Sequence, residues 1–85
     1  MKVYIVYDAP CRIGSEGFTH ESVFSTMDKA RSHLSRIAAE YVAEGYRIHT
    51  VSPLLSYAQY RNEGGKYEDE YMIYIAEYEV DEFDK

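Results

Sequence analysis

The stretch EDEYMIYIAEYEVDEF, residues 68–83, holds four aromatic rings and has carboxylates at both ends. Its β-branched and aromatic residues predict a long strand over residues 70–80. Side chains alternate between the two faces of a strand, and here both faces are apolar. One face carries Tyr71, Ile73 and Ile75, and the other carries Met72, Tyr74, Ala76, Tyr78 and Val80. Because a strand with one solvated side alternates apolar with polar residues, both faces of this strand need a cover.

The N-terminal residues show the same pattern. The run KVYIVYD, residues 2–8, predicts a first strand that is apolar on both faces, with Val3, Ile5 and Tyr7 opposing Tyr4 and Val6. Residues 9–20 contain one proline and two glycines and predict a loop. Residues 21–24 predict a short second strand that returns antiparallel beside the first.

A single helix is predicted between residues 25 and 45. Ser25, followed by Asp28, predicts its N-cap, and Gly45 predicts its end as a residue with left-handed dihedral angles. Between them apolar residues recur at steps of three and four, at Met27, Ala30, Leu34, Ile37, Ala38, Tyr41 and Val42. This single stripe is typical of a surface helix that lies on a sheet.

The remaining segments complete the fold class. Residues 46–51 predict a strand that Pro53 interrupts. Residues 54–61 fit a strand or a helical turn, and we favour a strand because residues 62–66, NEGGK, indicate a hairpin loop into the long last strand. The sequence therefore predicts an α+β fold in the order β-β-α-β-β, with a small antiparallel sheet of about four strands, or one strand more, and one amphipathic helix on one face. The 85 residues make a single domain, residues 1–85.

The net charge of −6 is concentrated in the C-terminal third. Residues 1–61 hold seven Lys/Arg and six Asp/Glu, whereas residues 62–85 hold two against nine. Such a surface repels nucleic acid and anionic membranes and attracts a basic protein. One cysteine excludes an internal disulfide, no secretion signal is present, and no apolar stretch approaches the roughly 20 residues that span a bilayer. We therefore expect a cytoplasmic protein without direct contact to nucleic acid or membrane.

One helix covers one face of a small sheet, so the second face is left over. Three covers are possible: the loop at residues 9–20, a second copy of the chain, or a different protein. Tyrosine is enriched at interfaces because it offers a large rigid ring with a polar tip. The candidate interface residues are Tyr4, Tyr57, Tyr60, Tyr74 and Tyr78. The alternative is that these rings simply fill a small sheet and leave their hydroxyls at its rim.

The carboxylates Glu68, Asp69 and Glu70 are candidates for binding a basic protein surface. Their simpler interpretation is a solvated charge run that protects the strand from aggregation. No catalytic residue, metal ligand or cofactor site is predicted. Cys11 has no partnering base at a recognisable spacing, and His20, His33 and His49 lack the paired spacing of metal ligands.

Three segments resemble small uncharacterised proteins that phages and prophages encode. They are VYIVYD at the start, VFSTMDKA leading into the helix, and YIAEYEVDEF at the end. In the strand-to-helix junction, Val23 and Phe24 match packing positions, Ser25 or Thr26 matches the cap, and Ala30 matches the first helical turn. In the closing strand, Glu77, Glu79 and Asp81 match alternating acids. Residues 46–67 lie outside the resemblance.

The resemblance implies a viral or mobile-element setting inside a bacterial host, and it implies no catalytic residue. Small acidic proteins in that setting act by occupying a host protein. We therefore expect a non-enzymatic accessory protein that binds a host protein, and inhibits one that handles nucleic acid, such as restriction or CRISPR machinery. A homodimer through the sheet is the simplest form of the interface. The alternative function is a module that sequesters a small molecule or nucleotide between two subunits, with stacked tyrosines and Arg12 or Arg47.

Overall fold

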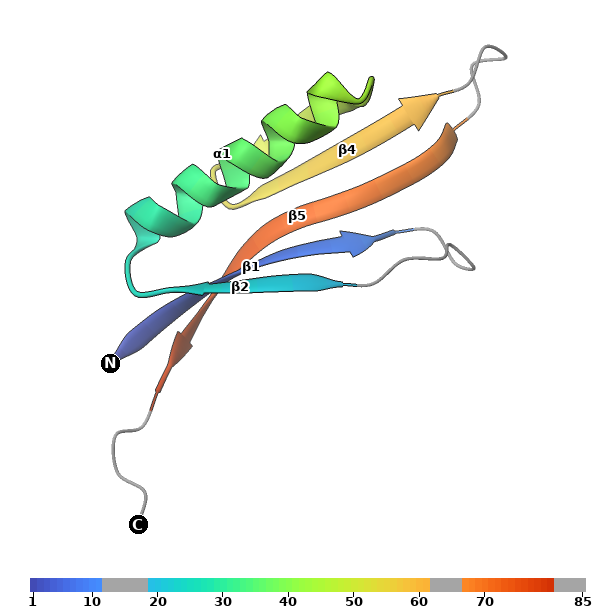
Figure 1. The fold of residues 1–85 in the computed structure, drawn as a ribbon. Helices are drawn as coiled ribbons and strands as arrows, with labels where there is room; N and C mark the ends of the chain where they lie inside the picture. The colour runs from blue at the N-terminus through green and yellow to red at the C-terminus, as the bar shows by residue number, and fades with distance from the viewer. Residues whose placement is uncertain (12–18, 62–66, 81–85) are drawn as a thin grey trace.

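The structure is a computed structural model that describes residues 1–11, 19–61 and 67–80, with residues 61 and 67–69 described by their backbone. Five strands and one helix follow one another along the described chain (Figure 1). Their bounds are β1 Lys2–Pro10, β2 His20–Phe24, α1 Met27–Ala43, β3 Arg47–Ser52, β4 Leu55–Arg61 and β5 Tyr67–Glu79. The predicted loop at residues 9–20 is shorter than expected, because β1 continues through Ala9 and Pro10 and β2 begins at His20. Residues 12–18, the predicted hairpin loop at residues 62–66 and the acidic end at residues 81–85 lie outside the described residues.

The strands form one antiparallel sheet in the order β2-β1-β5-β4-β3. The predicted α+β class, with one helix on an antiparallel sheet, is confirmed. The sheet has five strands rather than about four, because the segments on both sides of Pro53 form strands, and residues 53–54 turn the chain between them. β5 lies in the centre, where it pairs with β1 from Lys2 opposite Glu79 to Pro10 opposite Tyr71.

Helix α1 begins one residue later than predicted. Thr26, not Ser25, is the N-cap: it has extended backbone angles, and its hydroxyl oxygen accepts a hydrogen bond of 3.2 Å from the Lys29 amide. This bond satisfies one of the amides that a helix start leaves without a partner. Two neighbouring hydroxyl residues offer the same chemistry, so only the backbone conformation decides which of them caps the helix.

The end of the helix at Gly45 is confirmed. Gly45 has a φ of 100°, its amide donates to the carbonyl of Val42, and the Tyr46 amide donates to the carbonyl of Tyr41, each at 3.0 Å. This pair of bonds is the Schellman arrangement, which a residue in the left-handed region permits. The Tyr41 and Tyr46 rings then meet edge to face, with centroids 4.9 Å apart. The turn thus joins the helix to β3 and brings two tyrosines together.

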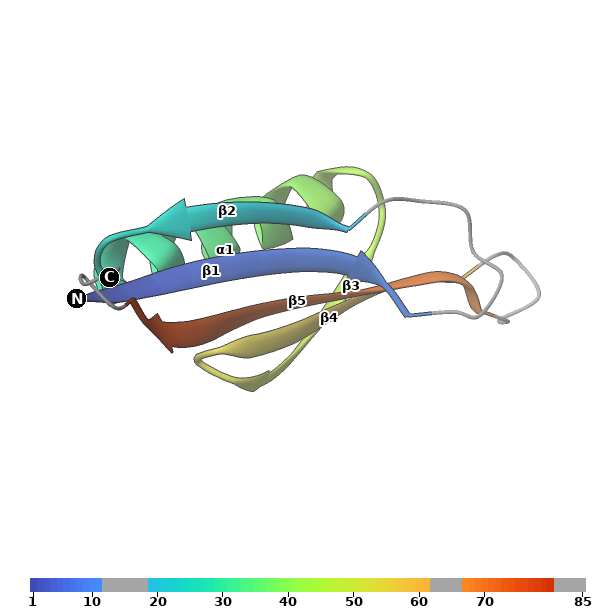
Figure 2. The same cartoon turned by 90° about the horizontal axis from the view of Figure 1, so that it is seen from below.

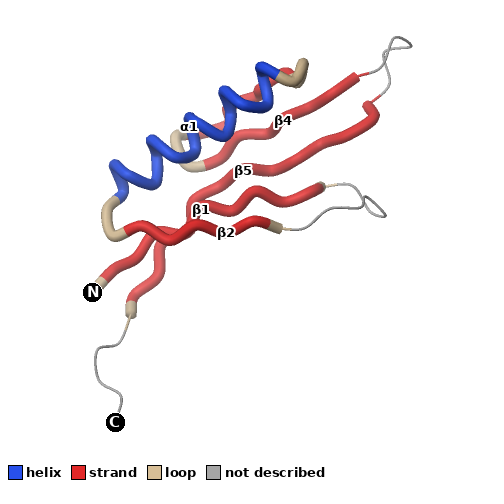
Figure 3. Tube along the Cα trace, in the orientation of Figure 1, coloured by secondary structure: helices blue, strands red, loops and turns tan. Residues whose placement is uncertain are grey.

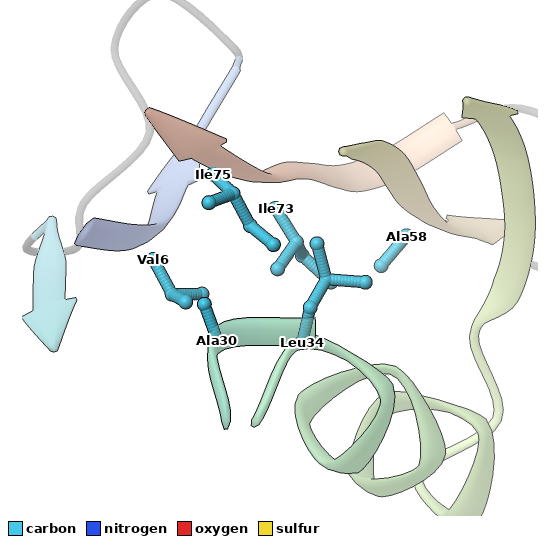
Figure 4. Packing of buried hydrophobic residues seen from close by; sticks show 6 residues of the cluster. All are labelled: Val6, Ala30, Leu34, Ala58, Ile73 and Ile75. Carbon is cyan, nitrogen blue, oxygen red and sulfur yellow. The ribbon is translucent and has the colours of Figure 1, made fainter. Parts of the chain in front are cut away.

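Helix α1 covers one face of the sheet, as the ribbon seen from below (Figure 2) and the tube in the orientation of Figure 1 (Figure 3) both show. The buried hydrophobic side chains lie between them (Figure 4): Val6, Ala58, Ile73 and Ile75 from the sheet, Ala30 and Leu34 from the helix. Larger side chains surround this cluster, among them Tyr4, Phe24, Met27, Ile37 and Tyr71. The core is therefore thin, and two of its six buried residues are alanines.

One residue of the predicted helical stripe does not pack against the sheet. Val42 is 55% exposed, whereas Tyr41 is half-buried. Successive helical residues are about 100° apart around the axis, so only one of the two can face the sheet. Tyr41 takes this position because its ring packs on Tyr46 and Tyr71.

Shortening Ile73 to valine should lower the free energy of unfolding by about 0.5–1.5 kcal/mol, because Ile73 is fully buried and the lost methyl leaves a cavity under the helix. Val42→Ala is the matched control, since Val42 is largely exposed, and its effect should stay within about 0.5 kcal/mol. Urea denaturation followed by circular dichroism measures both. An equal loss in the two variants would contradict this description of the core.

Candidate functional site

The face of the sheet opposite α1 is covered by none of the elements that the structure describes (Figure 2). We call it the open face. The strand registers assign its side chains, which are predominantly apolar in the central strands: Val3, Ile5, Tyr7 and Ala9 of β1, Met72, Tyr74, Ala76 and Tyr78 of β5, and Leu55 and Tyr57 of β4. Val23 of β2, opposite Ile5, extends this surface and is 62% exposed. The sequence prediction that β1 and β5 are apolar on both faces is confirmed.

Three tyrosines form the aromatic centre of the open face. The rings of Tyr7 and Tyr74, which are paired across β1 and β5, stack with centroids 4.7 Å apart. The hydroxyls of Tyr7 and Tyr78 lie 3.2 Å apart and share a hydrogen bond. This bond raises the pKa of Tyr7 to about 12. The centre of the open face is therefore uncharged near neutral pH.

Charged and polar side chains lie at the margins of the open face. Glu21 is on the β2 edge, opposite Tyr7, and Arg47 is on the β3 edge, opposite Gln59. At one end of the face, the side-chain amide of Gln59 donates a hydrogen bond of 2.7 Å to a carboxylate oxygen of Glu70. The open face is thus an apolar, aromatic surface with carboxylates at one edge and one end, and basic side chains at the other edge.

The structure brings together some of the predicted interface residues and separates others. Tyr57, Tyr74 and Tyr78 share the open face, and Glu70 lies at its end. Tyr4 and Tyr60 are on the helix side instead: Tyr4 packs against the buried cluster, and the Tyr60 ring lies 5.3 Å from that of Tyr46. Glu68 and Asp69 belong to β5, but their side chains lie outside the described part of the structure.

On the helix side, a second group of polar residues surrounds a cavity of about 310 Å³ between α1, β1 and β5. The hydroxyl of Tyr41 donates to both carboxylate oxygens of Asp8, at 2.9 and 3.1 Å. His20, Glu40 and Glu44 complete the polar part of the lining. Burial raises the pKa of Asp8, and the hydrogen bond from Tyr41 opposes this shift. Asp8 thus anchors the helix to β1 at an electrostatic cost.

Cys11 and His33 lack the surroundings that activate a nucleophile or a base. Burial and the nearby Glu70 raise the pKa of Cys11, which is the opposite of what activates a thiolate nucleophile. Burial also lowers the pKa of His33, whose Nδ1 accepts a hydrogen bond of 2.7 Å from Arg36. The side chain of His33 packs against Phe24, at a ring distance of 5.0 Å. Within residues 1–11, 19–60 and 70–80, no group of three His, Cys, Asp or Glu side chains is placed to hold a metal ion.

Sequence reasoning missed two features of these sites. The alternation of β1 predicts Tyr7 on the same face as Ile5, but Tyr7 is not among the predicted interface residues, although its contacts join Tyr74 to Tyr78. The alternation of β1 was signal enough to find it. The bond between Tyr41 and Asp8 joins residues 33 positions apart, and no local pattern indicates it.

Comparison of the chain with protein-family models, with curated proteins and with solved structures finds no match. The resemblance to phage-encoded proteins therefore stays a prediction from the sequence. The alternative function is a nucleotide site formed by stacked tyrosines with Arg12 or Arg47. Of these arginines, Arg47 shares the open face with Tyr57, and Arg12 lies outside the described residues. The one helix in the described chain is neither long nor apolar enough to cross a membrane.

Replacing Tyr41 by phenylalanine should lower the free energy of unfolding at pH 7 by about 1 kcal/mol. Hydrogen bonds to charged groups contribute about 1.5–3 kcal/mol, and the half exposure of Asp8 reduces this value. Urea denaturation measures the difference. Tyr57→Phe, a matched change on the open face, should leave stability within about 0.5 kcal/mol, and a loss as large as that of Tyr41→Phe would contradict the assignment.

Replacing Asp8 by asparagine should stabilise the protein at pH 7 and have little effect at pH 3. The pKa of Asp8 is raised on folding, so folding favours the protonated form. The contribution of Asp8 to stability is therefore complete below the ordinary pKa of an aspartate and is lost as the pH rises through its folded pKa. Thermal unfolding of both proteins at several pH values measures this. A variant that is less stable than the wild type at pH 7 would overturn the expected sign.

Proposed function

We propose that this chain is a non-enzymatic protein-binding module whose open face is its docking surface. The observation that carries the proposal is that a ten-residue apolar and aromatic surface lies on two central strands and their neighbour without a cover in the described structure. Contiguous apolar surfaces with a polar margin mark interaction sites on soluble proteins. Tyr74 and Tyr57 offer rigid rings with few rotatable bonds, which lose little entropy on binding.

The carboxylates beside the open face favour a partner with a basic surface. Glu70 lies at the end of the face, within the C-terminal third that holds nine Asp/Glu against two Lys/Arg. Negative charge at the rim accelerates encounter with a basic protein and repels nucleic acid. Together with the phage resemblance, this charge supports a host protein that handles nucleic acid, of the restriction or CRISPR type, as the target that the protein inhibits in the bacterial cytoplasm.

Capture from a bacterial lysate by matched variants tests the proposal. We expect a set of proteins to be retained by the wild type and by Glu44→Lys, which reverses a carboxylate on the helix side. The Glu70→Lys variant, and the triple reversal of Glu68, Asp69 and Glu70, should retain several-fold less of the same proteins at low salt, because the reversed charges repel a basic surface. Quantitative mass spectrometry measures the amounts.

The binding experiment has two contradicting outcomes. Equal retention by the wild type, Glu70→Lys and the triple reversal at low salt would remove the carboxylates from the interface. Tyr74→Glu places a charge in the centre of the open face. Equal retention by this variant would contradict the role of the open face in binding. Circular dichroism of each variant shows that the fold is kept before its retention is compared.

A further inference from the structure

The open face needs a permanent cover more than an ordinary docking surface does. Among the residues that the structure describes, the core on the helix side buries six hydrophobic residues, and only Val6 and Ile73 are large side chains that are fully buried. The single cysteine leaves no internal disulfide to stabilise the fold. Small domains with a thin core are commonly stabilised by oligomerisation when disulfides and metals are lacking.

The size of the open face fits a dimer interface. Five strands at about 4.8 Å span about 24 Å, and the nine residue pairs shared by β1 and β5 extend about 30 Å. Because the outer strands have only five and six residues, the flat area of the open face is about 600 Å². The protruding side chains add to this area. Stable interfaces bury about 600–1,000 Å² on each partner. A second sheet of the same size covers this face completely.

The charges at the two edges decide how such a second sheet lies. Glu21 is on the β2 edge of the open face, and Arg47 and His49 are on the β3 edge. A two-fold axis that runs along the strands lays β2 of one copy on β3 of the other, so the acidic edge of each copy lies on the basic edge of its partner. Glu21 lies in the row of Tyr74 and Arg47 in the row of Glu70, about 13 Å further along the strands, so the edges attract each other at long range without a direct ion pair. An axis across the strands lays each edge on itself and brings like charges together.

We propose that a second copy of the chain covers the open face, with the two-fold axis running along the central strand β5. This inference rests on the proposed function and deepens it: a second copy docks on the open face, and the basic host protein binds at the charged end that the dimer leaves exposed. The aligned packing of two sheets then stacks β1 on the partner's β4. Ala9 lies in the same row as Tyr57, so the small side chain of one copy faces the large ring of the other.

The same arrangement explains how the dimer keeps a surface for a basic protein. Glu70 lies at the end of the open face, where Gln59 of its own sheet holds the carboxylate. Because Glu70 lies on β5, the axis along β5 brings the Glu70 carboxylates of the two copies to face each other at the same end of the dimer, where they repel each other unless a positive charge lies beside them. Negative charge is concentrated there, outside the apolar contact, where the proposed basic partner binds.

Sedimentation equilibrium over a range of concentrations tests the proposal. The wild-type protein should sediment at about twice the 9.9 kDa of one chain, and Tyr74→Glu should sediment as a monomer with an unchanged circular dichroism spectrum. Ala39→Glu is the control, because Ala39 is exposed on the helix, and it should remain a dimer. A monomeric wild type, or a dimer that Tyr74→Glu leaves intact, would overturn the proposal.

A charge exchange tests the axis and does not depend on a variant with a buried charge. At low salt, where the attraction between the two edges is little screened, Glu21→Arg and Arg47→Glu should each raise the dissociation constant of the dimer several-fold, and the double variant should restore it. Additive weakening in the double variant would overturn the axis along β5. The two proposals can be contradicted separately. A monomeric wild type whose capture of lysate proteins is reduced by Tyr74→Glu would contradict the dimer alone. A dimer whose capture of lysate proteins is unchanged by Glu70→Lys would contradict the basic partner alone.

Discussion

The antiparallel pairing of the first strand with the last is the constraint on which the rest of the structure depends. β1 and β5 pair along all nine residues of β1, and they lie next to each other in the centre of the sheet. The ion pairs beside this ladder, Lys2 with Glu77 and the N-terminal ammonium with Glu79, are exposed and contribute little. What stabilises the pair is the apolar side chains on its two faces. β2 and the β3–β4 hairpin extend the sheet on either side, and α1 lies on the centre.

The register of this pair decides both the core and the candidate site. Val6 and Ile75 are opposite each other under the helix, and the next pair along, Tyr7 and Tyr74, points to the open face. A slip of one residue in either strand would bring core residues to the open face and tyrosines under the helix, so the register is strongly specified. The aromatic surface and the hydrophobic core are therefore formed by alternating residues of the same two strands. Neither forms without the other.

Most of the fold could be predicted from the sequence because its signals are local. Alternation in β1 and β5, the helical stripe and Gly45 all depend on residues close together in the chain. The grouping of the tyrosines is different, because it depends on which face of the sheet the helix covers. Tyr4 and Tyr60 belong to strands whose alternation is visible in the sequence, yet only the packing of α1 and of Tyr46, in the turn after it, shows that both rings lie on the covered side. The bond between Tyr41 and Asp8 is equally invisible, since it joins the helix to a strand far away in the sequence.

The residue types of the open face suit both contact with water and the proposed contact with a partner. A face of Ile and Leu alone would aggregate, whereas the hydroxyls of Tyr7 and Tyr78 bond to each other and keep a polar tip at the solvent. The edge strands are the competing route to association, because they leave backbone groups unpaired. Here β2 and β3 are five and six residues long and carry Glu21 and Arg47. Short charged edges disfavour sheet extension, which is consistent with the proposed association through the open face, where a second copy would complete the packing that the helix supplies on one side alone.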